Sequence, residues 1–479
     1  MLNLTNHIFY LFVTKARNNM RTFASVLGSA AAVANPFLEQ ETTPKFTKLE
    51  PKYLTPAVDQ LLDDMKSNFA KLEEKLGSVD SPDYEDVLPE VERIRSPMEY
   101  TWGVAGHLNG VKNGEELRES YQNNQPKVVK SFTEFSQSKA LYDALVKVQE
   151  GWSDDDECSF KEQQKRRAVE GTLRDMKLGG VGLEGADKER FNEIRLRLAE
   201  LSTKFSNNVL DVTKAFELTV DDASKLEGVP ASAKAMWAQA HEQFLKKEDP
   251  DATVDPEVGP YRITLDGPSY VATLSHVPDR DIREKVYKAY LTKASEADGD
   301  KNNVVLIEEI LKLKLESSKI LGFDNFAVQS LSSKMAPSVD SVRELTDLVA
   351  AKAGPAAYKE LEEITAYAQS KDETVGEKLS TWDVTFWSER YKEEKYAVTE
   401  EELRPYFALP AVLDGMFGLV ERIFNVEVKA ADGEVEVWNE DVSFYNVYDK
   451  ATEKHIASFF LDPYSRPADK RGGAWVSIP

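Results

Sequence analysis

The sequence contains few of the residues that particular functions need. Its 479 residues include one cysteine, Cys158, so no disulfide can form within the chain. Four acidic residues precede it at positions 154–157, and their negative field disfavours the thiolate that a nucleophilic cysteine requires. We therefore interpret Cys158 as an ordinary loop or helix residue.

Histidine is also scarce, and its spacing excludes a common zinc site. A zinc-binding helix of the type His-Glu-x-x-His needs two histidines four residues apart, so that both imidazoles face the metal. His241 and Glu242 begin this pattern, but Leu245 stands where the second histidine should be. No two histidines have the required spacing; they are His7, His107, His241, His276 and His455. We assign no catalytic, metal-binding or cofactor-binding residue in this chain.

Other catalytic and nucleotide-binding motifs are missing or occur in the wrong context. Residues 180–185 (GVGLEG) match the glycine pattern of dinucleotide-binding loops, but that pattern works only directly after a strand. The residues before it, 172–178, are charged and helix-like, which predicts a loop between two helices. The chain has no Gly-x-Ser-x-Gly elbow and no phosphate-binding loop.

Positive charge is in the minority. Lysine and arginine number 60 against 83 acidic residues, which gives a formal net charge of −23. Such a surface repels phosphate backbones and anionic membranes, so we expect neither nucleic acid nor a membrane as a partner.

The first 38 residues differ from the rest because they contain Lys15, Arg17 and Arg21 but no acidic residue. The apolar run at 8–13 is shorter than the roughly 20 residues needed to span a bilayer, and the basic residues follow it instead of preceding it. This composition favours a transit peptide for the mitochondrion or plastid over a secretory signal. Translation from Met20 would leave a cytosolic protein, and a tail without a role is the remaining alternative.

The hydrophobic pattern predicts a mainly helical protein. Apolar residues recur every three or four positions at 58–72 and at 191–212, where Asp187 could cap the helix, and helical patterns continue at 100–108, 128–148, 281–321 and 342–370. Strands are predicted at 261–265, 435–438, 442–448 and 455–461, with a hairpin loop at 449–454. The expected fold is a large helical body with a small β element near the C-terminus.

Several segments, taken together and in order, closely resemble the thimet oligopeptidase and oligopeptidase A family of zinc metallopeptidases, especially its plant and algal organellar or cytosolic members. In the last third these segments are 382–390 (WDVTFWSER), 402–407 (ELRPYF), 459–466 (FFLDPYSR) and 470–475 (KRGGAW). Earlier ones are 201–211 (LSTKFSNNVLD), 280–290 (RDIREKVYKAY) and 321–327 (LGFDNFA). The resemblance extends over residues 54–475.

The resemblance implies a channel-type oligopeptidase that hydrolyses short peptides, including cleaved targeting peptides. It also implies a zinc ion held by two histidines and a glutamate, with the glutamate of the zinc motif as general base. It divides the chain into a leader at 1–38, an N-terminal helical region at 39–225 and the front part of the catalytic domain at 226–479.

The chain departs from the family at its end. The family's zinc helix follows the segment that resembles 470–475, but only Val476, Ser477, Ile478 and Pro479 remain here. We therefore expect an incomplete catalytic domain that binds no zinc and is inactive alone, either as a genuine short protein or through an incomplete gene model. A non-catalytic peptide-binding or regulatory protein is the alternative, and the oligomeric state stays open.

Overall fold

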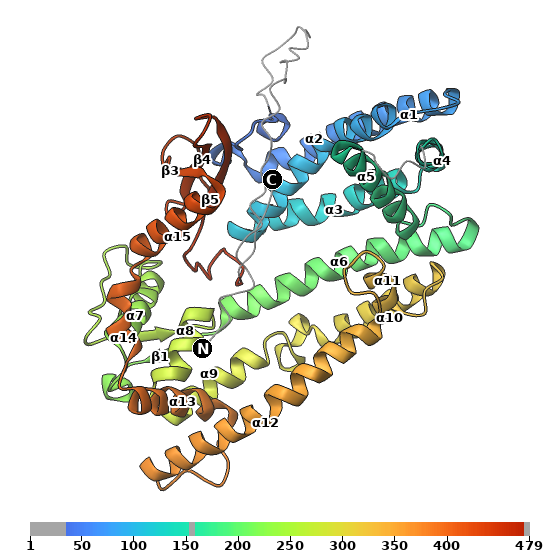
Figure 1. The fold of residues 1–479 in the computed structure, drawn as a ribbon. Helices are drawn as coiled ribbons and strands as arrows, with labels where there is room; N and C mark the ends of the chain where they lie inside the picture. Colours follow the sequence, from blue (N-terminus) through green and yellow to red (C-terminus); the bar gives the residue numbers. More distant parts are fainter. Residues whose placement is uncertain (1–34, 153–158, 474–479) are drawn as a thin grey trace. The chain divides into compact units, whose positions relative to one another are not determined.

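The computed structural model describes residues 35–152 and 159–473, which form two compact units (Figure 1). Residues 35–50 and 398–464 make up the sheet unit, and residues 51–152, 159–397 and 465–473 make up the helical unit. Helices dominate, with only small antiparallel sheets, so the predicted mainly helical fold is confirmed. The division into 39–225 and 226–479 stays a prediction about the family's organisation.

Six long helices form the first half of the helical unit. They are α1 (Leu54–Ser78), α2 (Tyr84–Val111), α3 (Glu115–Ser136), α4 (Lys139–Glu150), α5 (Phe160–Leu178) and α6 (Gly185–Ala215), after the short turn η3 (Pro51–Tyr53). Helix α1 packs against α2, α3 and α4, and α3 packs against α6. Asp83 caps α2 because its carboxylate accepts from the backbone N–H of Asp86, and the Asp86 side chain accepts from the N–H of Asp83.

Two sequence predictions about these helices are wrong in detail. Residues 128–148 are not one helix, because Ser138 interrupts them and its hydroxyl caps α4 by accepting from the backbone N–H of Leu141 at 3.1 Å. Asp187 does not cap α6, since Glu184 holds the capping position and Asp187 lies in the first turn. There its charge still suits the helix dipole.

Helix α6 buries the predicted apolar stripe. Ile194 and Leu201 pack against Leu306 and Leu313 of α10 (Val304–Ile320). Ion pairs flank this contact: Arg197 meets Glu309 at 2.6 Å, and Arg190 meets Glu316 at 2.6 Å. These arginines hold the pKa values of Glu309 and Glu316 below their ordinary range.

The second half of the helical unit has a core around Trp237, which is fully buried. The indole N–H of Trp237 donates to the Ser269 hydroxyl at 2.9 Å. The elements are β1 (Leu218–Val220), η4 (Ala223–Leu226), α7 (Ala231–Leu245), β2 (Tyr261–Ile263), α8 (Gly267–His276), α9 (Arg280–Leu291), η5 (Glu296–Lys301), α11 (Phe326–Leu331), α12 (Val339–Lys371) and α13 (Thr381–Tyr396). Strands β1 and β2 pair antiparallel. The helical stretch predicted at 281–321 is thus two helices, α9 and α10, separated by η5.

The sheet unit combines short helices with a three-stranded antiparallel sheet of order β3-β4-β5. Its elements are η1 (Pro36–Leu38), η2 (Phe46–Lys48), α14 (Glu400–Leu403), η6 (Arg404–Phe407), α15 (Leu409–Phe424), β3 (Val426–Ala430), β4 (Ser443–Asp449) and β5 (His455–Leu461). The predicted strands at 442–448 and 455–461, and the hairpin loop between them, are confirmed.

The strand predicted at 435–438 is wrong, because β3 lies earlier and pairs with β4 from Val426 to Ala430. The chain turns at Gly433, whose φ is +85°, and Glu436 instead accepts from the backbone N–H of Thr47 at 2.9 Å. Phe460 of β5 packs against Phe46 at a ring-centroid distance of 5.7 Å and against Trp438 at 5.2 Å. Phe46, Trp438 and Phe460 therefore pack together within the sheet unit.

Within the two described ranges, none of the helices combines the length and apolar character that crossing a membrane requires.

Candidate functional site

Two of the family-like segments meet where α9 packs against α13. Asp383 of α13 is buried and binds two arginines of α9: its Oδ1 lies 2.7 Å from Nη2 of Arg283, and its Oδ2 lies 3.0 Å from Nε of Arg280. The guanidinium of Arg283 also lies 4.2 Å from the ring centroid of Phe386, and that of Arg280 lies 5.4 Å from that of Trp382. The segment 280–290 is thus joined to the segment 382–390 by charge and by cation–π contacts.

Arg283 is only 3% exposed, so its charge depends on these partners. Burial lowers the pKa of the Arg283 guanidinium, while the hydrogen bond to Asp383 opposes that shift. Arg283 Nη1 also donates to the carbonyl oxygens of Val277 at 2.8 Å and Pro278 at 2.9 Å. Both terminal nitrogens of Arg283 are thus engaged, whereas its buried Nε has no hydrogen-bond partner in the described structure. The residue positions α9 against α13.

A second polar cluster joins the segment 201–211 to the segment that begins at Lys470. Arg471 Nη2 donates to the side-chain oxygen of Asn207 at 3.2 Å, and its backbone N–H donates to Gly110 at 2.9 Å. In the same helix, Asp211 accepts two hydrogen bonds from Arg118, both at 2.9 Å. Burial lowers the pKa of Arg471. Ala474 and Trp475, which complete the family-like segment, lie outside the described residues.

Neither cluster places a nucleophile beside a base, and neither was predicted from the sequence. The partners are about 100 residues apart in the chain for Arg283 and Asp383, and 264 apart for Arg471 and Asn207. No local pattern signals such pairs. Their effect is to fix the relative positions of helices within the helical unit.

His241 lies on α7 and is buried. Its Nδ1 has no hydrogen-bond partner in the described structure. Glu242 is engaged elsewhere: it pairs with Lys246 and accepts from the backbone N–H of Val254 at 3.2 Å. Leu245 ends the helix. As a metal site, this turn of α7 would supply a single imidazole, and its carboxylate is already paired with Lys246.

The glycine-rich segment 180–185 follows helix α5 and leads into α6, which confirms the predicted loop between helices. Gly180 has a φ of +84°, and a Cβ there would lie 2.9 Å from Leu183 and 3.1 Å from Phe191. The glycine is needed for local packing.

Among the described helices, exposed large apolar side chains are most numerous on α10, α12 and α15. On α10, Val304, Ile307, Leu311 and Leu315 form a stripe on the side opposite to the residues that contact α6. On α12, only Ala368 of 33 residues is buried. On α15 in the sheet unit, exposed apolar residues recur every three or four positions; they are Leu409, Val412, Met416, Leu419 and Ile423. We call this last set the α15 stripe.

Two models of known protein families match successive parts of the chain. Residues 58–188 match the model described as "Neurolysin/Thimet oligopeptidase, N-terminal domain", and residues 273–478 match "Peptidase family M3". The helical fold and these two matches define the class of protein: the M3 peptidases. The chain belongs to the thimet oligopeptidase and oligopeptidase A family, which confirms the family predicted from its segments.

Three relatives illustrate the similarity. The organellar oligopeptidase A (chloroplastic/mitochondrial) of Arabidopsis thaliana is 38% identical over 94% of this chain and 55% of the relative. The probable cytosolic oligopeptidase A of the same plant is 38% identical over 92% of the chain and 61% of the relative. Oligopeptidase A of Escherichia coli is 35% identical over 93% of this chain and 62% of the relative. The chain therefore spans about three-fifths of the length of these relatives.

Membership of the family implies zinc in the intact enzymes. The residues that the structure describes do not fit a zinc ion, because no group of three or more His, Cys, Asp or Glu side chains comes together in them. His276 instead lies 3.3 Å from Nη2 of Arg390, and His455 lies 2.8 Å from the Ser458 hydroxyl. His7 and Cys158 lie outside the described residues.

Proposed function

We propose that this chain supplies the N-terminal helical region and the front part of the catalytic domain of a zinc-dependent oligopeptidase that hydrolyses short peptides. The observation that carries the proposal is the ordered similarity to oligopeptidase A proteins over 94% of the chain, at 38% identity. Cleaved targeting peptides are the substrates we favour, in line with an organellar role. The divisions at 1–38, 39–225 and 226–479 belong to this proposal.

The zinc ligands and the general base, in this proposal, are not among the 479 residues. The spacing of the five histidines supports this, since none forms a His-x-x-x-His pair. The exposed apolar residues of α10, α12 and α15 support it as well. Helical faces of this kind are normally covered by the rest of a fold.

A chimera tests the proposal. Residues 39–475 joined to the part of the Arabidopsis organellar oligopeptidase A that extends beyond the matched region should hydrolyse a quenched fluorescent peptide, and EDTA should abolish the activity. A chimera with glutamine in place of the glutamate of its zinc motif is the matched control and should be inactive, because the general base is lost. A folded, zinc-loaded chimera without hydrolysis would refute the proposal.

We also propose that residues 1–38 direct the protein to the mitochondrion or the plastid. Their basic, acid-free composition supports this, and the named relatives include both organellar and cytosolic forms. A fluorescent protein fused after residue 38 should enter an organelle. The same fusion with Lys15, Arg17 and Arg21 replaced by glutamate should stay in the cytosol. Cytosolic fluorescence from the unaltered fusion, or organellar fluorescence from the charge-reversed one, would refute the proposal.

A further inference from the structure

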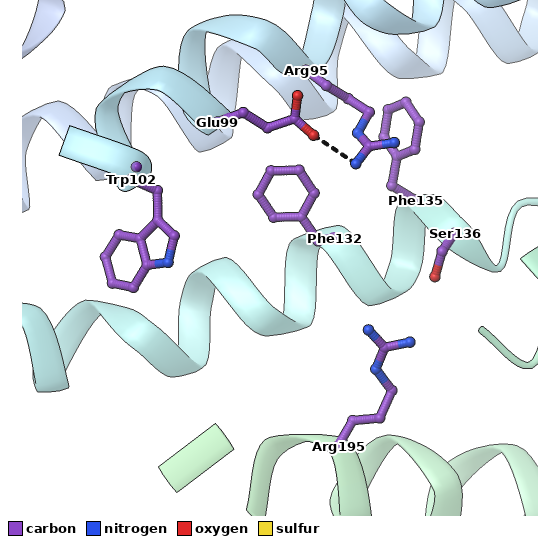
Figure 2. Close-up of a pocket in the computed structure, with 8 residues that line it drawn as sticks. Arg95, Glu99, Trp102, Phe132, Phe135, Ser136 and Arg195 are labelled. Atoms are coloured by element: carbon purple, nitrogen blue, oxygen red, sulfur yellow. Dashed lines mark ion pairs between the residues drawn. The ribbon is translucent and has the colours of Figure 1, made fainter. Parts of the chain in front are cut away.

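A cavity of about 430 Å³ opens between helices α2, α3 and α6 of the helical unit. Its lining residues come from all three helices; they are Arg95, Glu99, Trp102, Gly103, Phe132, Phe135, Ser136 and Arg195 (Figure 2). This volume lies in the range of about 300–1,000 Å³ that small-ligand sites occupy. The cavity lies outside residues 273–478, which match the peptidase model.

Arg195 is the unusual residue of this cavity. It makes no hydrogen bond or ion pair with any residue that the structure describes, and its guanidinium lies 6.0 Å from the ring centroid of Phe191. Figure 2 shows its guanidinium extending from α6 toward Ser136 of α3. Burial lowers the pKa of Arg195, and no acidic side chain counteracts that shift.

Two other arginines of α6 have acidic partners, so the lack of one is particular to Arg195. Arg190 pairs with Glu316 and Glu193, and Arg197 pairs with Glu309 and Glu200. These carboxylates raise the pKa values of both arginines. A half-buried guanidinium without such a partner is desolvated at a cost that a bound anion would offset.

The charge of the cavity matches a single negative charge. Arg95 is held by Glu99, with 2.6 Å between Nη2 and Oε1, so these two side chains nearly neutralise each other. Arg195 then contributes a net charge of about +1 to the lining. A planar guanidinium suits a carboxylate, which it can bind through two parallel hydrogen bonds.

The other residues that line the cavity indicate which chemical groups a carboxylate ligand should carry. Trp102, Phe132 and Phe135 supply aromatic surface, and they are held in place: Trp102 stacks on Tyr121 at 4.2 Å and Phe135 on Phe69 at 3.7 Å. The Ser136 hydroxyl donates to the carbonyl oxygen of Thr133 at 2.9 Å, so its lone pairs remain to accept from an N–H group. A carboxylate, an amide N–H and an aromatic ring occur together in one common unit, the C-terminal aromatic residue of a peptide.

We propose that this cavity binds the C-terminal residue of a short peptide ending in an aromatic amino acid. Arg195 binds the carboxylate, Ser136 accepts from the amide N–H, and the aromatic lining holds the ring. The site goes beyond the proposed hydrolysis because it requires neither zinc nor a catalytic group.

Calorimetric titration of the full chain with N-acetyl-phenylalanine tests the proposal. Leu419→Glu, which is outside the cavity, is included to limit self-association. We expect saturable binding, and binding of N-acetyl-phenylalanine amide weaker by about 10-fold or more, because the charge-assisted hydrogen bonds are lost. N-acetyl-alanine should also bind more weakly, since it lacks the ring.

Substitution of the arginines completes the test. Arg195→Gln should weaken binding of the acid by about 10-fold or more, whereas Arg197→Gln, which removes a paired arginine from the same helix, should leave it within about 2-fold. Equal affinity for the acid and the amide, unchanged binding by Arg195→Gln, or no binding at millimolar ligand would overturn the proposal. The acid-to-amide comparison decides the question even if Arg195→Gln fails to fold. Since the readout is binding, its failure leaves the proposed hydrolysis untouched.

Discussion

Replacement of Asp383 by alanine is expected to lower the free energy of unfolding of the helical unit by about 3–5 kcal/mol. The reason is that Arg283, only 3% exposed, would keep its charge without the carboxylate that now lies 2.7 Å away. Arg280 would lose the same partner, although its exposure to water softens that loss. Urea denaturation followed by circular dichroism measures the change.

Two further variants show whether the buried charge is the cause. Asp340→Ala removes a carboxylate from an exposed pair with Arg343 and should change the free energy of unfolding by less than about 0.5 kcal/mol. The double variant Arg283→Met, Asp383→Leu removes both charges and should recover much of the stability lost in Asp383→Ala. Equal stability of the Asp383→Ala and Asp340→Ala proteins would contradict this account of the α9–α13 contact.

Residues 39–479 expressed alone are expected to self-associate through exposed apolar surface such as the α15 stripe. Leu419 is 44% exposed on this stripe, and Leu419→Glu should reduce self-association while changing the free energy of unfolding by less than about 0.5 kcal/mol. The adjacent Val420 is 6% exposed and packs against Val426 and Val447. Val420→Glu should destabilise the sheet unit by about 3 kcal/mol or more, because a charge would be buried without a partner.

Size-exclusion chromatography with light scattering, together with thermal unfolding, separates the two effects. We expect the unaltered protein of residues 39–479 to self-associate. The Leu419→Glu protein should associate less and keep the same melting temperature. The Val420→Glu protein should be unfolded or melt at a lower temperature. A monodisperse unaltered protein would contradict the expectation that its exposed apolar faces drive self-association. Equal melting of the two variants would contradict the orientation of α15.

The parts of the fold set by local pattern were predictable from the sequence. The alternation at 455–461 and the polar loop at 449–454 gave β5 and its hairpin, and the period at 191–212 gave α6. Residues 435–438 alternate in the same way as a strand. They form none because the choice of pairing partner is made over long range, and β4 pairs with residues 426–430.

The polar contacts could not be predicted, because their partners are far apart in the chain. Nothing local to Arg283 or Asp383 shows that the two side chains meet 2.7 Å apart. The helical period places Arg190 and Arg197, seven residues apart, on one face of α6 and Arg195 on another, but nothing local shows what each arginine meets. They differ because Glu309 and Glu316 of α10 lie within reach of two of them and leave Arg195 in the cavity. The family, in contrast, was evident from its ordered segments.

We propose that this member of an oligopeptidase family has no catalytic zinc site among its own 479 residues. Metal analysis and peptide hydrolysis by the purified chain, after incubation with zinc, test it most directly, with Escherichia coli oligopeptidase A as the active control. We expect far less than one zinc per chain and no hydrolysis of a quenched short peptide that EDTA can suppress. One zinc per chain, with hydrolysis lost in EDTA and restored by added zinc, would contradict the claim.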